Sequence, residues 1–267
     1  MNGLGVLQKY YEDLLTAIHF LTRIPVPLPS YRPDSLACSV KFFPLVGLLV
    51  GTLAGATNLL VAPHLPRLTT SLMVVIFLML LTGCLHEDGL ADAADGFGGG
   101  WDRAQIMRIM RDSRIGTYGA ATLTTSLLAR IVLLSSITMQ EVLAYLITAH
   151  VLSRWTALPL GFYLQAASSL DSPTGHPSSD KPSGHQGARI AGTITRSTLV
   201  SGTLYSFAIA FIALRSHAFA PIVAAVVVTL LSGFLYRRKL GGATGDCFGA
   251  TNQLTEIGVY LAGAWTV

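Results

Sequence analysis

The chain has 267 residues, of which 51% are hydrophobic and only 12% are charged. Soluble domains carry about 25% charged residues, and disordered chains combine low hydrophobicity with high net charge, so both classes are excluded. The net charge of +4 is too small to indicate a nucleic-acid-binding protein. We therefore expect a polytopic membrane protein that forms one integral membrane domain over residues 1–267.

The first expected element is an amphipathic helix near the N-terminus. It ends before Pro25, because proline disrupts a helix interior. With charged residues on its other faces, such a helix lies in the membrane interface. Its apolar residues recur at helical spacing: Leu7, Tyr11, Leu14, Ile18 and Leu21.

Six later stretches are apolar enough to cross a bilayer, which takes about 20 mainly apolar residues. A seventh span would begin near Gly249 and include Glu256, whereas the only charges in the six spans are Arg130 and Arg154. The expected fold is an all-helical bundle of six or seven spans. The six spans are 42–62, 68–85, 116–138, 142–164, 197–214 and 217–236.

Lysine and arginine outside these spans alternate between successive segments. From the N-terminal segment to the C-terminal one, the segments carry 4, 1, 4, 0, 3, 1 and 3 of them. Cytoplasmic loops carry the excess of positive charge, so the N-terminus and the loop after the second span are predicted to be cytoplasmic. The loop of about 165–196 is rich in Ser, Pro, Gly and His and is expected to be polar and mobile.

Acidic residues concentrate in the loop that follows the second span. It holds six of the chain's 14 acidic residues, and a helix continuing from the span would place Asp88, Asp92 and Asp95 on one face. Like charges at this spacing destabilise a helix, whereas a bound Mg²⁺, which prefers oxygen ligands, would stabilise it. We expect these three aspartates to bind Mg²⁺. A solvated acidic helix end, stopped by Gly96 and the glycines at 98–100, is the alternative.

Two further clusters on the same predicted face could hold a phosphate. Arginines such as Arg111 and Arg114, with Ser113 between them, can bind phosphate oxygens bidentately, although positive-inside topology also explains arginines beside a span. Segment 240–249 has four glycines around Asp246 and could form a phosphate cradle with a further metal ligand. An ordinary glycine turn is the competing interpretation.

Carboxylates, arginines and glycines on one membrane face suggest metal-assisted attack on a diphosphate. The metal would neutralise the leaving phosphate. Asp92, Asp95 or His86 would take the proton of the attacking hydroxyl, and a capped interfacial histidine is the alternative for His86.

In these motifs the chain resembles the cobalamin synthase family, also described as adenosylcobinamide-GDP ribazoletransferases. The resemblance covers most of the chain, except the loop of 165–196 and Gln253, where the family pattern has Glu. The motifs that carry it are 20–27 (FLTRIPVP), 43–47 (FPLVG), 82–86 (TGCLH), 88–92 (DGLAD), 95–96 (DG), 109–116 (IMRDSRIG) and 241–246 (GGATGD).

The resemblance implies a Mg²⁺-dependent enzyme of the prokaryotic cytoplasmic membrane, with its active site facing the cytoplasm. It would join adenosylcobinamide-GDP to α-ribazole or α-ribazole 5′-phosphate and release GMP, giving adenosylcobalamin or its 5′-phosphate. The bilayer would be its other partner, with no nucleic acid, and a homo-oligomer is left open. The implied metal ligands are Asp88, Asp92, Asp95 and Asp246, and the implied substrate-binding residues are Arg111, Ser113, Arg114, Gly241, Gly242, Thr244 and Gly245.

Three alternatives to this function remain. A CDP-alcohol phosphotransferase would need arginine where Asp92 stands. A UbiA-like prenyltransferase would need a second Asp-rich motif, and Asp246 has no aspartate near it in the sequence. A divalent-cation transporter would place its ligands within the spans, where the six predicted spans contain no acidic residue.

Overall fold

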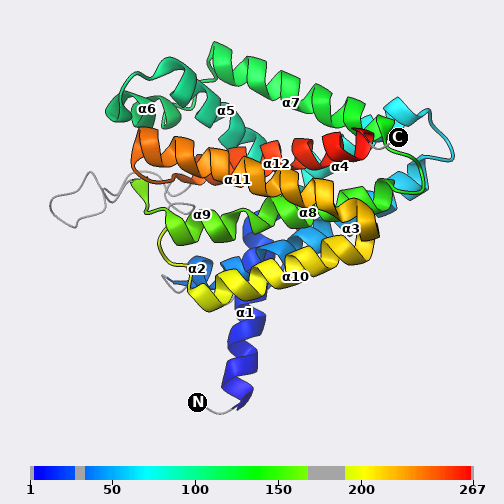
Figure 1. Cartoon of the computed structure of the whole chain (residues 1–267), viewed down its shortest axis with the longest axis horizontal. Coiled ribbons are helices and arrows are strands. Elements are labelled where there is room, and N and C mark those ends of the chain that lie inside the picture. Colours follow the sequence, from blue (N-terminus) through cyan, green and yellow to red (C-terminus); the bar gives the residue numbers. More distant parts are fainter. Residues whose placement is uncertain (1–2, 28–33, 168–189, 266–267) are drawn as a thin grey trace.

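The computed structural model describes residues 3–27, 34–167 and 190–265, and this part of the chain is an all-helical bundle (Figure 1). The predicted fold class is therefore confirmed. The long helices are α1 (Gly3–Leu21), α3 (Phe43–Val61), α4 (Arg67–Thr82), α5 (Leu85–Gly99), α7 (Thr117–Ser136), α8 (Val142–Trp155), α10 (Arg196–Leu214), α11 (Phe219–Leu240) and α12 (Gly245–Trp265). The shorter ones are α2 (Ser35–Ser39), α6 (Arg103–Met110) and α9 (Ala157–Tyr163), with 3₁₀ turns η1 (Val40–Phe42) and η4 (Arg215–Ala218).

Three described helical stretches are long and apolar enough to cross a membrane: Ser35–Val61, Thr117–Ser136 and Arg196–Leu240. A fourth is added if the bent pair of α4 and α5 counts as one span. The stretch Arg196–Leu240 has 45 residues, about twice the length of one crossing. Its two helices, α10 and α11, run in opposite directions and meet at η4 (Figure 1), which agrees with two predicted spans. The chain is an integral membrane protein.

The central helix of the bundle is α8, in which 11 of 14 residues are buried. The predicted span 142–164 is this helix followed by α9, with a turn at Thr156 between them. Helix α3 approaches α8 so closely that a Cβ on Gly47 would lie 2.1 Å from the carbonyl oxygen of His150. Small residues at four-residue spacing permit such close packing between helices in a membrane. Gly51 meets Ile147 in the same way.

Helix α1 follows the predicted amphipathic segment and ends at Leu21, before Pro25. In Figure 1 it projects from the bundle and runs across the direction of the long helices. Leu7 is exposed near its free end, whereas Leu21 is buried in the core. Its location in the membrane interface stays a prediction. Asp13 was expected on a polar face of this helix. It is instead buried, and its carboxylate lies 2.9 Å from Nζ of Lys41.

The acidic segment does not continue straight from α4, and that expectation was wrong. Gly83 and Cys84 both adopt left-handed backbone conformations, with φ of 64° and 57°, so α5 leaves α4 at an angle of 90°. Gly96 does not stop α5 either. The helix runs on to Gly99. Gly96 packs against the side chains of Met110 and Ile106, which leave no room for a Cβ there.

The charge alternation makes a direct prediction about orientation. The start of α6 and the end of α11 lie at one end of the bundle, and the start of α4 and η4 lie at the other (Figure 1). Single cysteines at Arg103 and Arg238 should therefore be labelled by an impermeant thiol reagent only from the cytoplasmic side. Cysteines at Arg67 and Arg215 should be labelled only from outside.

The labelling requires a background in which the three native free cysteines are replaced. Labelling of position 103 in intact cells by the impermeant reagent would contradict the predicted orientation.

Candidate active site

The aspartates of the acidic segment lie on α5, a regular helix over Leu85–Gly99, so their predicted one-face spacing is confirmed. Asp88 is exposed, Asp92 is half-buried and Asp95 is buried. The helix packs against α6, α7 and α12.

Asp246 joins this face from the other end of the sequence. The backbones of α5 and α12 meet at glycines, because a Cβ on Gly89 would lie 3.1 Å from the Cα of Asp246 and 3.3 Å from the Cα of Gly249. Burial, followed by the charges of Asp246, Asp88 and Asp95, raises the pKa of Asp92, which lies beyond the predicted span that ends at Leu85. The structure thus brings Asp246, from the glycine-rich segment, beside the aspartates of α5.

The chemistry of these donors fits Mg²⁺, although the protein alone does not form a closed metal cage. Among the residues that the structure describes, no group of three or more His, Cys, Asp or Glu side chains is arranged to hold a metal ion. Mg²⁺ usually takes one or two carboxylates and completes its octahedral shell with water and substrate phosphates. Crowded carboxylates such as those of Asp92 and Asp246 suit an ion held jointly with a phosphate substrate.

Asp95 has a structural role that the sequence did not reveal. Its two carboxylate oxygens accept hydrogen bonds from the backbone N–H groups of Gly116 and Gly119, at 2.7 and 2.8 Å. These groups lie at the N-terminus of α7, where the helix dipole favours a negative charge. A Cβ on either glycine would overlap the Asp95 carboxylate. Asp95 therefore fastens α5 to α7, and its predicted catalytic and metal-binding roles stay predictions.

The predicted arginine cluster forms an exposed loop between α6 and α7. Arg114 is 86% exposed, and its guanidinium pairs with the carboxylate of Asp112 at 2.7 Å rather than with α5. Arg111 and Ser113 are also exposed. Phosphate binding by these residues stays a prediction.

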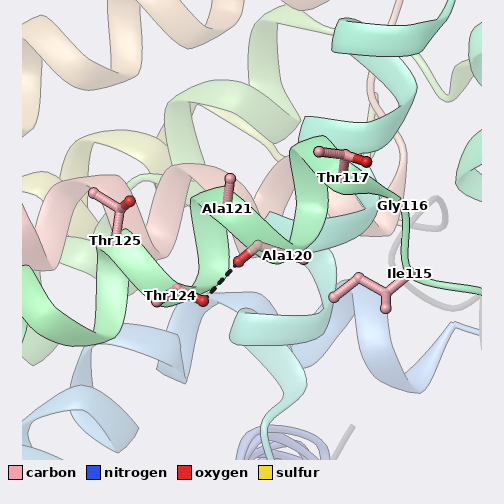
Figure 2. Close-up of a pocket in the computed structure, with 7 residues that line it drawn as sticks. All are labelled: Ile115, Gly116, Thr117, Ala120, Ala121, Thr124 and Thr125. Carbon is pink, nitrogen blue, oxygen red and sulfur yellow. Dashed lines mark hydrogen bonds between the residues drawn. The ribbon is translucent and has the colours of Figure 1, made fainter.

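An open groove of about 650 Å³ begins at the end of this loop, where Gly116 bonds to Asp95. Figure 2 shows it along α7, with Thr124 donating a hydrogen bond to the carbonyl of Ala120 at 2.8 Å. Its lining is small and uncharged and belongs to the end of the loop and the first turns of α7. The lining residues are Ile115, Gly116, Thr117, Ala120, Ala121, Thr124 and Thr125.

The glycine-rich segment after α11 is folded into the protein, and phosphate binding by Gly241, Gly242, Thr244 and Gly245 stays a prediction. Gly241 ends α11 in the left-handed conformation, with φ of 70°. Gly242 faces the carbonyl of Gln165, which would lie 2.3 Å from a Cβ. Both glycines are thus explained by packing and backbone geometry. Thr244 caps α12 by accepting from the N–H of Cys247 at 3.3 Å, and Gly245 is the first residue of α12.

The candidate general base His86 lies in the first turn of α5. It is only 6% exposed, and its backbone packs 3.4 Å from the position of a Cβ on Gly249. A role as general base stays a prediction. The two histidines of the loop of 165–196, His176 and His185, lie outside the described residues.

The sequence did not reveal the partners of the two arginines in the spans. Glu87 and Glu256 are buried and pair with Arg130 and Arg154. The signal was present in the sequence. Because an unpaired charge in a membrane is costly, Arg130 and Arg154 each required an acidic partner.

The fold and the site define an integral membrane protein whose carboxylates, drawn from α5 and α12, gather at one end of a helical bundle. The chain belongs to the cobalamin-5-phosphate synthase family, whose model matches residues 13–264.

Proteins named adenosylcobinamide-GDP ribazoletransferase are similar over nearly the whole chain. The one from Polaromonas sp. is 35% identical, and the alignment covers 96% of this chain and 97% of the relative. The one from Sinorhizobium medicae is 37% identical over 95% of this chain and 96% of the relative. The one from Pseudoalteromonas atlantica is 35% identical over 96% of this chain and 91% of the relative. No solved structure matches the chain. The family resemblance seen in the motifs is confirmed.

Proposed function

We propose that this protein is an adenosylcobinamide-GDP ribazoletransferase of cobalamin synthesis. The observation that carries the proposal is its similarity to proteins of that name over almost the full length of both chains. The family match favours this reaction over a CDP-alcohol phosphotransferase, a UbiA-like prenyltransferase and a divalent-cation transporter.

In the proposed reaction, a hydroxyl of α-ribazole or α-ribazole 5′-phosphate attacks the phosphorus on the cobinamide side of the diphosphate. The new P–O bond forms as the P–O–P bond breaks, and GMP leaves with the bridging oxygen. The proton of the attacking hydroxyl passes to a carboxylate of the acidic face, for which Asp92 is our first choice because its pKa is raised.

The acidic face would also hold Mg²⁺ through Asp88, Asp92 and Asp246, with Asp95 as a further candidate. When bound, the ion would neutralise charge on the diphosphate and on the leaving GMP. Arg111, Ser113 and Arg114 are placed on a loop whose last residue, Gly116, touches Asp95, so a phosphate at the acidic face would lie within the reach of this part of the chain. By the positive-inside pattern, the site faces the cytoplasm of a prokaryotic cell.

The proposal predicts that the purified protein in detergent releases GMP from adenosylcobinamide-GDP only when α-ribazole or its 5′-phosphate is present. GMP and the corrinoid product are measured together by chromatography, with Mg²⁺ or with EDTA. Release without the ribazole would indicate a hydrolase, and unchanged release in EDTA would contradict the Mg²⁺ site. Consumption of a CDP-linked lipid instead would favour the phosphotransferase alternative.

A further inference from the structure

The bundle contains a cluster of five buried ionisable side chains that the proposed reaction does not use. The cluster spans α5, α7, α8 and α12, and each member is at most 3% exposed. We call it the charge cluster. Its members are Glu87, Arg130, His150, Arg154 and Glu256.

Arg130 connects three helices within this charge cluster. Its Nη1 lies 2.7 Å from Oε1 of Glu87 on α5 and donates to Oε1 of Gln253 on α12 at 2.9 Å. Its Nη2 lies 3.3 Å from Oε2 of Glu256, also on α12. Arg130 itself belongs to α7. The rigid, forked guanidinium suits simultaneous contacts of this kind better than an ammonium group does.

The other half of the charge cluster holds Glu256 against α8. Oε1 of Glu256 lies 3.1 Å from Nδ1 of His150 and 3.6 Å from Nη1 of Arg154. Two carboxylates thus face two guanidinium groups, and the formal charge balances when His150 is neutral. Because buried charges are tolerated only when they are paired, the balance constrains how the four helices can pack.

The charge cluster bears on the acidic face through the geometry of α5. Glu87 immediately precedes Asp88, and successive residues of a helix point about 100° apart. With Glu87 held in the interior, Asp88 is exposed. Anchoring Glu87 therefore fixes the rotation of α5. Arg130 also binds α12, the helix that carries Asp246.

We infer that Arg130 is a positioning residue which, through Glu87, Gln253 and Glu256, sets α5 and α12 so that their aspartates face one another. This inference rests on the proposed function for its meaning in catalysis, because the aspartates are the proposed Mg²⁺ site. Arg130 does not contact the substrate. It acts by fixing the relative rotation of α5 and α12, the two helices that carry the aspartates of the proposed Mg²⁺ site.

The test compares three variants of the full-length protein in detergent. Glu87→Gln keeps the size of the side chain and removes its charge, whereas Arg130→Lys keeps the buried charge and removes the fork, so it also serves if Glu87→Gln does not fold. Val50→Ala is the matched control, since Val50 is fully buried but lies on α3, away from α5. Hydrogen–deuterium exchange of peptides covering residues 85–99 is measured, together with the Mg²⁺ concentration that gives half-maximal GMP release.

Both charge-cluster variants should speed exchange in α5 and raise the half-maximal Mg²⁺ concentration, by about tenfold for Glu87→Gln, the scale of one charge-assisted hydrogen bond. Val50→Ala should change neither. Variants that lose activity only in proportion to folded protein, with exchange of α5 and Mg²⁺ dependence unchanged, would overturn the inference. If the parent protein releases no GMP, the proposed function fails, whereas the exchange measurement still decides whether Arg130 anchors α5.

Discussion

Asp92→Asn should reduce turnover by about 100-fold or more while the protein stays folded in the membrane. Asp92 is central to the acidic face, since Asp246, Asp88 and Asp95 all raise its pKa in addition to burial. Asparagine would remove both a metal ligand and the carboxylate that takes the proton. It would also relieve like-charge repulsion on α5, so the fold should not suffer.

Thermal unfolding in detergent separates these effects. The pKa of Asp92 is higher in the folded protein than in the unfolded chain. Ionisation of Asp92 therefore lowers the free energy of unfolding, and this loss begins as the pH rises above the ordinary pKa of an aspartate. In EDTA at pH 8, Asp92→Asn should therefore unfold at the same or a higher temperature than the parent. At a pH below the ordinary aspartate range this difference should vanish. Added Mg²⁺ should stabilise the parent but not the variant.

Asp102→Asn is the matched control for this prediction. Asp102 caps α6 by accepting from the N–H of Gln105 at 2.8 Å, and asparagine caps a helix equally well. Turnover of the control should match the parent. Full activity of Asp92→Asn, or an equal loss in Asp102→Asn, would contradict an Mg²⁺ site centred on Asp92.

Asp95→Asn should lose both activity and stability, in contrast to Asp92→Asn. Each oxygen of Asp95 accepts one backbone N–H from α7, and an asparagine side chain offers only one oxygen for the two donors. Leaving a buried N–H without an acceptor costs about 1–3 kcal/mol. Relief of like-charge crowding, which the sequence alone suggested would keep this variant stable, is smaller at about 0.2–0.5 kcal/mol per pair.

The measurement is the unfolding temperature of purified Asp95→Asn beside that of Asp92→Asn. Only the Asp95 variant should unfold at a lower temperature than the parent. It should also release GMP more slowly, because the loop at Gly116 is no longer held by both contacts of Asp95. Equal unfolding temperatures for the two variants would show that the contacts of Asp95 with Gly116 and Gly119 do not stabilise the protein.

Glu87 shows what helical periodicity leaves out. Its position about 100° from Asp88 on α5 separates it from the acidic face. Within the bundle, Glu87 is buried and bonded to Arg130 at 2.7 Å. Periodicity predicts the face of its own helix on which a side chain lies. It does not predict which residues of other helices that side chain contacts.

The class of protein, the positions of most helices and the one-face spacing of Asp88, Asp92 and Asp95 could all be predicted from the sequence. These features depend on composition and on periodicity within single segments, and both can be read locally. The motifs also identified the family, because they follow one another along the chain in the order that is typical of that family.

The contacts between residues far apart in the sequence are seen only in the folded bundle. Asp246 lies beside α5 because Gly89 and Gly249 allow two backbones to approach, and Arg130 reaches Glu256 because α5, α7 and α8 all pack against α12. The bend at Gly83 and Cys84 likewise turned α5 away from α4. Contacts between residues more than 100 positions apart depend on how helices pack and on the need of buried charges for partners, and no local pattern encodes either.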